Sequence, residues 1–176
     1  RVLRSRAAMQ QALLSLLAEM PLDQITGAMI AARAGIGYAT FFRHYADVRA
    51  LLIDTVAQVT DEIAATMMPA LLAADSGRAS AALVDAVAAR RTVFHALLVG
   101  AGDALRGEVA RQAMARVASL PDLSPAWLPR TLAIRVAVTS TIEILDWWLR
   151  EAPDNPPATI AALLDRLVIA RFAQDG

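Results

Sequence analysis

Side chains that could contact nucleic acid gather in one N-terminal stretch, residues 25–49. The stretch predicts two short helices, Gly27–Ala34 and Tyr38–Tyr45, joined by a turn at Gly35. Such helices pack at a steep angle, and the second can then enter a major groove of DNA. The outward positions of the second helix are therefore candidate DNA contacts: Tyr38, Ala39, Thr40, Arg43 and His44.

The remaining residue types of this stretch fit the steep packing. Ala31 is small where the two helices approach each other, and Gly35 suits the left-handed conformation of a helix end. Ile36 and Phe41 can fill the angle between the helices. The spacing of Ala31, Gly35 and Phe41 is what a helix-turn-helix requires.

The stretch resembles the helix-turn-helix of the TetR family of bacterial repressors, over roughly residues 4–55. The resemblance rests on these matches in register: Ile25-Thr26, Ile30-Ala31, Ala34-Gly35-Ile36-Gly37, Ala39-Thr40-Phe41-Phe42, His44-Tyr45 and Asp47-Val48-Arg49-Ala50-Leu51-Leu52. It implies a homodimer that binds a pseudo-palindromic operator in double-stranded DNA. It adds Thr26, Gly37, Phe42 and Arg49 to the candidate DNA contacts.

Three positions depart from the family pattern. Phe42 stands where the family has a tyrosine whose hydroxyl reaches a phosphate, and Val48 replaces a phosphate-contacting lysine next to Arg49. Gly37 replaces a serine that caps the recognition helix. Each departure removes a contact to the DNA backbone or to the helix end, so a modest affinity for DNA is expected.

Other chemistries find little support in the sequence. The chain has no cysteine and no lysine, which excludes disulfides, thiolate metal sites and a Walker A loop. Gly35-Ile36-Gly37 follows a predicted helix rather than a strand, so it is not a dinucleotide loop. The two histidines, His44 and His95, lie far apart in the sequence. We therefore expect no metal, no cofactor and no enzyme activity.

The composition is apolar without a membrane signal. Of the 176 residues, 57% are hydrophobic, and the net charge is zero. The charge-free runs Ala7–Ala18 and Ile63–Ala74 are shorter than the ~20 apolar residues of a membrane span. No signal peptide is predicted, so the expected location is the cytoplasm. The apolar excess favours a subunit interface, a ligand cavity, or both.

Strand patterns are nearly absent, and the breakers divide the chain into about nine helices. The predicted fold is all-α: an N-terminal three-helix head joined by the long helix Val48–Ala74 to a C-terminal helical bundle. Residues 1–46 are expected to form the helix-turn-helix DNA-binding domain. Residues 47–176 are expected to bind a ligand and to dimerise, as the resemblance implies.

The bundle offers candidates for both of these roles. The expected cavity walls are Met67, Phe94, Leu98, Met114, Val117 and Trp127, with Arg135, Thr139 and Glu143 as polar contacts. An anionic ligand would favour Arg135 as its partner, and a cationic ligand would favour Glu143. The alternative for this polar stripe is a solvated helix face with ion pairs. The expected dimer contacts are Ile142, Leu145, Ile160, Leu164 and Leu167.

The expected function is that of a repressor released from DNA by a small hydrophobic ligand. Two alternatives remain at this point. One is a helical interaction module with a vestigial helix-turn-helix, and the other is an all-α enzyme.

Overall fold

The computed structural model describes residues 2–100, 102–122 and 124–173, which form helices and turns without a strand. The all-α prediction is therefore confirmed. The α-helices are α1 (Val2–Leu17), α2 (Gly27–Arg33), α3 (Tyr38–His44), α4 (Val48–Leu72), α5 (Ser76–Ala89), α6 (Arg91–His95), α7 (Gly102–Ala118), α8 (Arg130–Arg150), α9 (Pro157–Leu164) and α10 (Ala170–Ala173). Shorter turns are η1 (Leu22–Gln24), η2 (Ala96–Gly100) and η3 (Asp165–Ile169).

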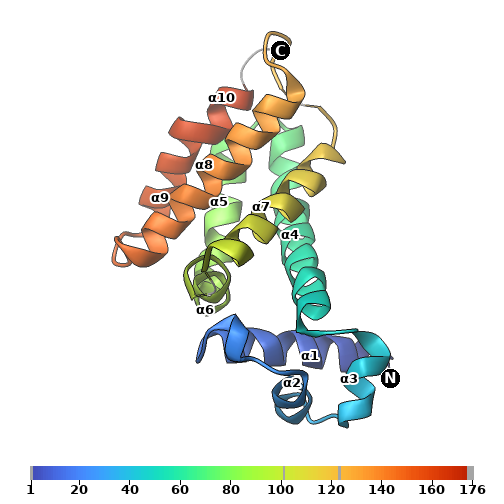
Figure 1. Cartoon of the computed structure of the whole chain (residues 1–176). Helices are drawn as coiled ribbons and strands as arrows, with labels where there is room; N and C mark the ends of the chain where they lie inside the picture. Colours follow the sequence, from blue (N-terminus) through green and yellow to red (C-terminus); the bar gives the residue numbers. More distant parts are fainter. Residues whose placement is uncertain (1, 101, 123, 174–176) are drawn as a thin grey trace.

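The helices are arranged as a small head below a larger bundle (Figure 1). In the head, α1 packs against α2, and α2 against α3. The long helix α4 rises from the head into the bundle, where it packs against α5 and α7. The bundle is completed by α8 and α9, and the continuous run α9–η3–α10 ends it. One apolar core passes through both parts, because Leu13 of α1, Leu51 of α4 and Trp148 of α8 are all fully buried within it.

Local signals account for the start and the end of α4. The Asp47 carboxylate accepts a hydrogen bond from the Ala50 N–H at 2.7 Å, so it caps the first turn. The helix continues through Pro69 and ends at a left-handed residue, Ala74, whose φ is +54°. There the Asp75 N–H donates to the Ala70 carbonyl at 2.9 Å, which is the bond of a Schellman end.

Two predicted boundaries were wrong. The sequence predicts one helix over residues 78–99, but α5 ends at Ala89 and α6 begins at Arg91. Arg90 between them has φ −126° and ψ 36°, outside the helical region. No glycine or proline in the sequence marks this break. The change of direction at Arg90 brings Phe94 and η2 into the core. The helix expected to begin at Pro125 begins instead at Arg130, after Pro129 in an extended conformation.

Candidate DNA-binding surface and ligand cavity

The helix-turn-helix is held by the residues that the sequence singled out. The Thr26 hydroxyl accepts a hydrogen bond from the Met29 N–H at 3.2 Å and caps α2. Gly35 adopts a φ of +66°, and the next amide, Ile36 N–H, donates to the Ala31 carbonyl at 3.0 Å. Phe41 is completely buried beneath α3. The turn therefore orients α3 as the sequence predicts.

Gly27 is a further packing position that sequence reasoning missed. A Cβ at this position would stand 3.0 Å from the Phe41 ring, which is closer than ordinary packing allows. The first residue of α2 is therefore small because the Phe41 ring of α3 crosses it. The signal in the sequence is a glycine inside a predicted helix, where glycine is otherwise unfavourable.

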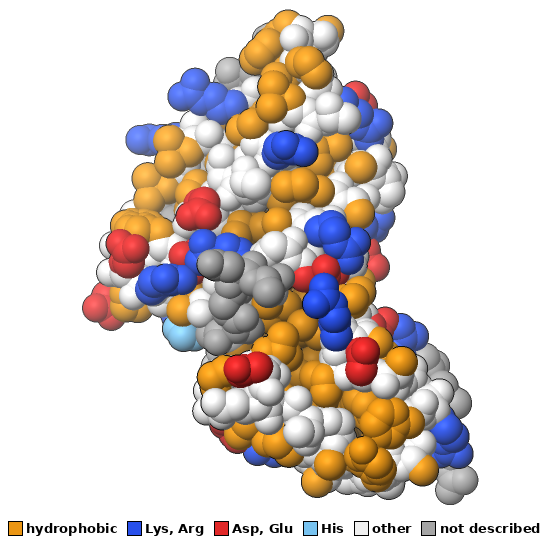
Figure 2. Space-filling model, in the orientation of Figure 1, with side chains coloured by type: hydrophobic (Ala, Val, Ile, Leu, Met, Phe, Trp, Pro, Cys, Tyr) orange, Lys and Arg blue, Asp and Glu red, His pale blue; other side chains and the backbone are white. Residues whose placement is uncertain are grey.

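The opposite face of α3 carries two exposed aromatic rings. Tyr38 is 58% exposed and Phe42 is 48% exposed, and their ring centroids lie 4.9 Å apart in an edge-to-face contact. Beside them, the Arg43 guanidinium donates to the Thr40 hydroxyl at 2.9 Å. Figure 2 shows hydrophobic side chains gathered on the lower lobe, the lobe that contains the head. This face can offer apolar contacts, a hydroxyl and one positive charge to a groove.

The structure places all nine candidate DNA contacts at or near the surface of the head. Thr40 and His44 are half-buried. The others are exposed: Thr26, Gly37, Tyr38, Ala39, Phe42, Arg43 and Arg49. Gly37 precedes α3 without a side chain to cap it, which matches the departure noted in the sequence.

A polar cluster joins the head to α4. The Asp54 carboxylate accepts hydrogen bonds from the Tyr45 hydroxyl at 2.6 Å, from Gln10 Nε2 at 2.9 Å and from Arg6 Nε at 2.8 Å. The Arg6 hydrogen bond is the main cause that lowers the pKa of Asp54, against the opposing effect of burial. Burial and the Asp54 carboxylate raise the pKa of Tyr45 to about 12. The sequence analysis missed this cluster, because its members lie far apart along the chain.

The bundle encloses a cavity of about 470 Å³ between α4, α7 and α8. The volume lies within the range of small-molecule sites. Four of the predicted wall residues line it: Met67, Phe94, Leu98 and Val117. Most of the remaining lining is also apolar. The charged residues that line it are Arg116, Asp122 and Arg130.

Several predicted cavity residues do not line the cavity, and these predictions were wrong. Met114 packs against the core elsewhere, and Trp127 is 73% exposed. Arg135, Thr139 and Glu143 lie on the exposed face of α8, whereas Ala137, Thr141 and Leu145 face inward. Apolar residues lie on both sides of these polar positions along α8, among them Val136, Val138 and Ile142. The sequence therefore did not distinguish its inner face from its outer one.

Of the polar stripe on α8, Glu143 forms an ion pair with α7, and the buried Asp146 one turn further along the helix joins the same group of charges. Arg106 of α7 contacts Glu143 at 3.4 Å and Asp146 at 2.8 Å. Arg150 contacts Asp146 at 3.0 Å, four residues apart on the same helix. The alternative interpretation of the stripe, a solvated face with ion pairs, is the one that the contacts support.

Four of the five predicted dimer contacts belong to the core of the subunit itself. Ile142, Leu145, Ile160 and Leu164 are buried within the subunit itself, with exposed fractions of 7% or less. Leu167 is 60% exposed and remains accessible. Large apolar side chains that α8 does leave exposed are Leu132, Val136 and Trp147. The spacing of apolar residues predicts which helices are apolar. It does not show which of their apolar residues belong to the core of the subunit.

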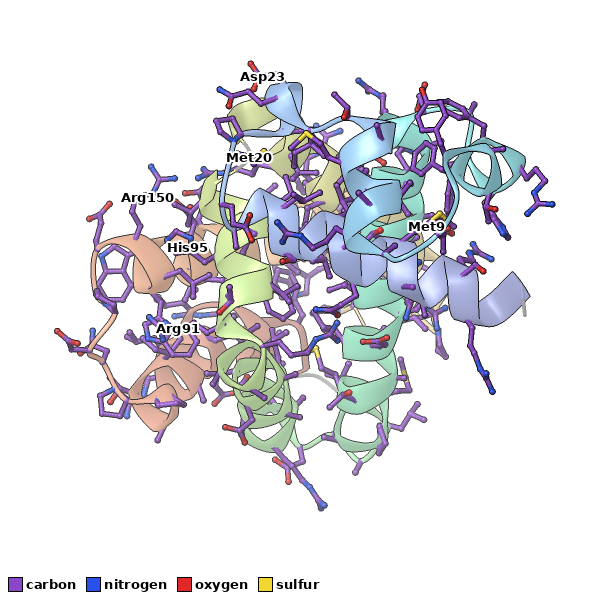
Figure 3. The ribbon with its side chains drawn as sticks, turned by 90° about the horizontal axis from the view of Figure 1, so that it is seen from below. Met9, Met20, Asp23, Arg91, His95 and Arg150 are labelled. Atoms are coloured by element: carbon purple, nitrogen blue, oxygen red, sulfur yellow. The ribbon has the colours of Figure 1, made fainter. Side chains whose placement is uncertain are left out.

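The second histidine lies apart from both sites. His95 is exposed and does not line the cavity. Seen from below, His95, Arg91 and Arg150 lie on the side of the molecule away from α3 (Figure 3). Arg91 stacks over the Trp148 ring at 4.8 Å and donates to the Pro153 carbonyl at 3.1 Å, so it anchors the α8–α9 turn.

The described residues hold no group of three or more His, Asp or Glu side chains that could bind a metal ion. Among the helices that the structure describes, none has the length and hydropathy to cross a membrane.

Comparison with known proteins shows similarity in structure only. No protein-family model matches the sequence, and no curated protein matches it either. The fatty acid degradation regulator FadR from Bacillus halodurans superimposes with a TM-score of 0.74 at 15% identity, covering 94% of each chain. FadR from Bacillus subtilis, solved in complex with stearoyl-CoA, gives 0.70 at 13% identity, covering 94% of this chain and 98% of that one.

A third solved structure is NalD from Pseudomonas aeruginosa, a repressor of the MexAB-OprM multidrug efflux pump. It gives a TM-score of 0.66 at 17% identity and covers 99% of this chain and 98% of that one. A TetR transcriptional regulator from Streptococcus agalactiae gives 0.70 at 17% identity and covers 96% of this chain and 95% of that one. The chain therefore has the fold of TetR regulators, as the resemblance of its N-terminal motif implied.

Proposed function

We propose that the protein is a transcription regulator that binds double-stranded operator DNA through α3. The observation that carries the proposal is the division of α3 into two faces. Phe41 is completely buried, whereas Tyr38 and Phe42 are exposed beside Arg43. A helix held by a steep turn with such an outer face suits the major groove. The TetR-type fold supports the same function.

In this proposal residues 1–46 form the DNA-binding domain and residues 47–176 form the ligand-binding and dimerisation domain. Two copies present two α3 helices to successive major grooves of a pseudo-palindromic operator in the cytoplasm. Repression follows from occupancy of the operator. We expect the dimer contact to be formed by α8 and η3, because both leave large apolar side chains exposed: Leu132, Val136, Trp147 and Leu167.

Selection of bound genomic fragments followed by titration in rising salt tests the DNA-binding function. Binding should weaken steeply as salt rises, because phosphate contacts release counterions. The double variant Arg43→Ala/Thr40→Ala should lose about 1–3 kcal/mol of binding free energy if Arg43 contacts a guanine. Arg78→Ala, an exposed arginine on α5, is the matched control and should bind as the parent does. A chain that binds no duplex DNA would instead be a helical interaction module.

The cavity is proposed as the site of a small hydrophobic effector. Part of its wall comes from α4, so an occupant contacts the helix whose Asp54 accepts the hydrogen bond of Tyr45 at the end of α3. FadR from Bacillus subtilis in complex with stearoyl-CoA supports a ligand with a long apolar part. The effector releases DNA only if it binds the DNA-free arrangement more tightly than the DNA-bound one.

A further inference from the structure

The charged residues that line the cavity lie close together in the sequence, around the α7–α8 connection. They are Arg116 in the last turn of α7, Asp122 in the following connection, and Arg130 at the start of α8. The lining residues of α4 and η2, among them Val56 and Leu98, are mostly apolar. The cavity lining therefore has a charged part around the α7–α8 connection and an apolar part along α4 and η2.

The cavity is also elongated. Its lining residues on α4 extend from Val56 to Leu71, and those on α8 extend from Arg130 to Leu145. Each stretch covers 15 helical steps, or about 22 Å. The two helices run in opposite directions, and the end of α4 and the beginning of α8 both lie in the upper part of the bundle (Figure 1). Such a shape suits a long, narrow ligand more than a compact one.

The two arginines differ in how their charge is balanced. Arg116 Nε lies 2.7 Å from the Asp61 carboxylate, so this arginine already has an anionic partner. The Arg130 guanidinium instead donates to two backbone carbonyls, those of Ala118 at 3.0 Å and Leu120 at 2.6 Å. Both of these acceptors are neutral.

The nearest carboxylate leaves Arg130 incompletely paired. Asp122 Oδ2 lies 3.8 Å from Arg130 Nε, and Asp122 Oδ1 accepts the Ser124 N–H at 3.0 Å. The neutral carbonyls hold the guanidinium in place without cancelling its charge. Both carbonyls accept from Nη2, so the donors that remain are Nη1 and Nε, and a carboxylate can accept a charge-assisted hydrogen bond from a guanidinium held in this way.

From this geometry we propose that the cavity binds a long-chain carboxylate, with the alkyl chain between α4 and α8 and the carboxylate at Arg130. The inference rests on the proposed ligand-binding function, for which it names the chemical class of the effector. The chain replaces water along the apolar walls, and the head group remains at the charged part of the lining near solvent. Arg130 thus takes the role that the sequence analysis assigned to Arg135.

Calorimetric titration with four probes of equal chain length tests the proposal: dodecanoate, dodecanol, dodecylammonium and dodecanoyl-CoA. Dodecanoate should bind the parent protein roughly tenfold or more tightly than dodecanol, and more tightly than the other two probes. In Arg130→Gln this preference over dodecanol should disappear. Arg135→Gln, an exposed arginine on the same helix, is the matched control and should retain the preference.

Two further variants keep the test decisive if Arg130→Gln does not fold. Arg130→Lys retains the charge but not the guanidinium that the two carbonyls hold in place, so it should prefer dodecanoate to dodecanol by a smaller factor than the parent. Asp122→Asn removes the competing carboxylate and should strengthen dodecanoate binding.

Equal affinities of the parent for dodecanoate and dodecanol would overturn the proposal while leaving a ligand cavity in place. A preference for dodecanoyl-CoA would overturn it as well, because that probe has no carboxylate next to its chain. Failure of all four probes to bind would overturn the proposal together with the hydrophobic effector. The salt-dependent DNA titration reports separately on the regulator function.

Discussion

The Tyr45 hydroxyl donates a 2.6 Å hydrogen bond to the Asp54 carboxylate and so joins the end of the recognition helix to the long helix α4. Tyr45 directly follows α3, and Asp54 lies in the second turn of α4. Arg6 and Gln10 of α1 donate to the same carboxylate. One carboxylate thus holds three elements together where the head meets the bundle.

Loss of this bond should destabilise the protein modestly. Tyr45→Phe leaves the buried ring in place but removes the hydroxyl, while Asp54 keeps Arg6 and Gln10 as partners. The free energy of unfolding should fall by about 1 kcal/mol, measured by urea denaturation. The control is Tyr38→Phe, which alters an exposed tyrosine of the same head and should leave the free energy of unfolding unchanged. An unaltered midpoint for Tyr45→Phe would mean that the hydroxyl contributes nothing to the junction.

The environment of Tyr45 also determines how the stability of the protein changes at high pH. The folded pKa of Tyr45 is about 12, above the value of 10.0 for a free tyrosine. A raised pKa stabilises the fold below the unfolded value, and this contribution is lost as pH rises through the folded value. Since the chain has two tyrosines, the variant Tyr38→Phe leaves Tyr45 as its one tyrosine. Its ultraviolet titration should then show a midpoint near pH 12, and a midpoint near 10 would contradict the prediction.

Two glycine substitutions should have opposite effects. Gly35→Ala places a Cβ at φ +66°, where no neighbouring atom stands within 4 Å, so the cost is one of backbone strain alone. It should destabilise the protein by about 1–2 kcal/mol. Gly107 also has no atom near its missing Cβ, but it lies inside α7. Gly107→Ala should therefore stabilise by roughly 0.5–1 kcal/mol. Thermal unfolding of both variants measures the contrast, and equal signs would refute it.

Phe42→Tyr should strengthen DNA binding. Phe42 is 48% exposed on the outer face of α3, so an added hydroxyl projects from the surface without disturbing the core. A hydroxyl that reaches a phosphate forms a charge-assisted hydrogen bond, and a gain of roughly tenfold in affinity is expected. Fluorescence anisotropy with a selected operator measures the gain. Unchanged affinity would place position 42 away from the DNA backbone.

Leu167 and Leu164 should respond differently to a charge. Leu167 is 60% exposed, so Leu167→Asp should give a folded chain that no longer dimerises. Leu164 is fully buried within the subunit, so Leu164→Asp should unfold the chain by burying an unpaired charge. Sedimentation combined with circular dichroism separates the two outcomes. A folded dimer of Leu167→Asp would remove η3 from the interface.

Short-range patterns were enough to predict the head. The left-handed Gly35 and the buried Phe41 act through neighbours a few residues away, and the structure has both of them as the sequence predicts. Caps and turns depend on the local backbone, so they can be predicted without knowledge of the rest of the fold. The all-α class follows in the same way from helix-forming composition and from breakers.

Tertiary packing alone decided the site in the bundle. Apolar residues lie on several sides of α8, so its spacing could not show that Leu145 and Ile142 turn inward and that Arg135 turns to solvent. Arg130 became a cavity residue because the α7–α8 connection folds back and supplies two carbonyls to its guanidinium. Contacts between residues distant in sequence depend on how whole helices dock. No short window of the chain contains that information.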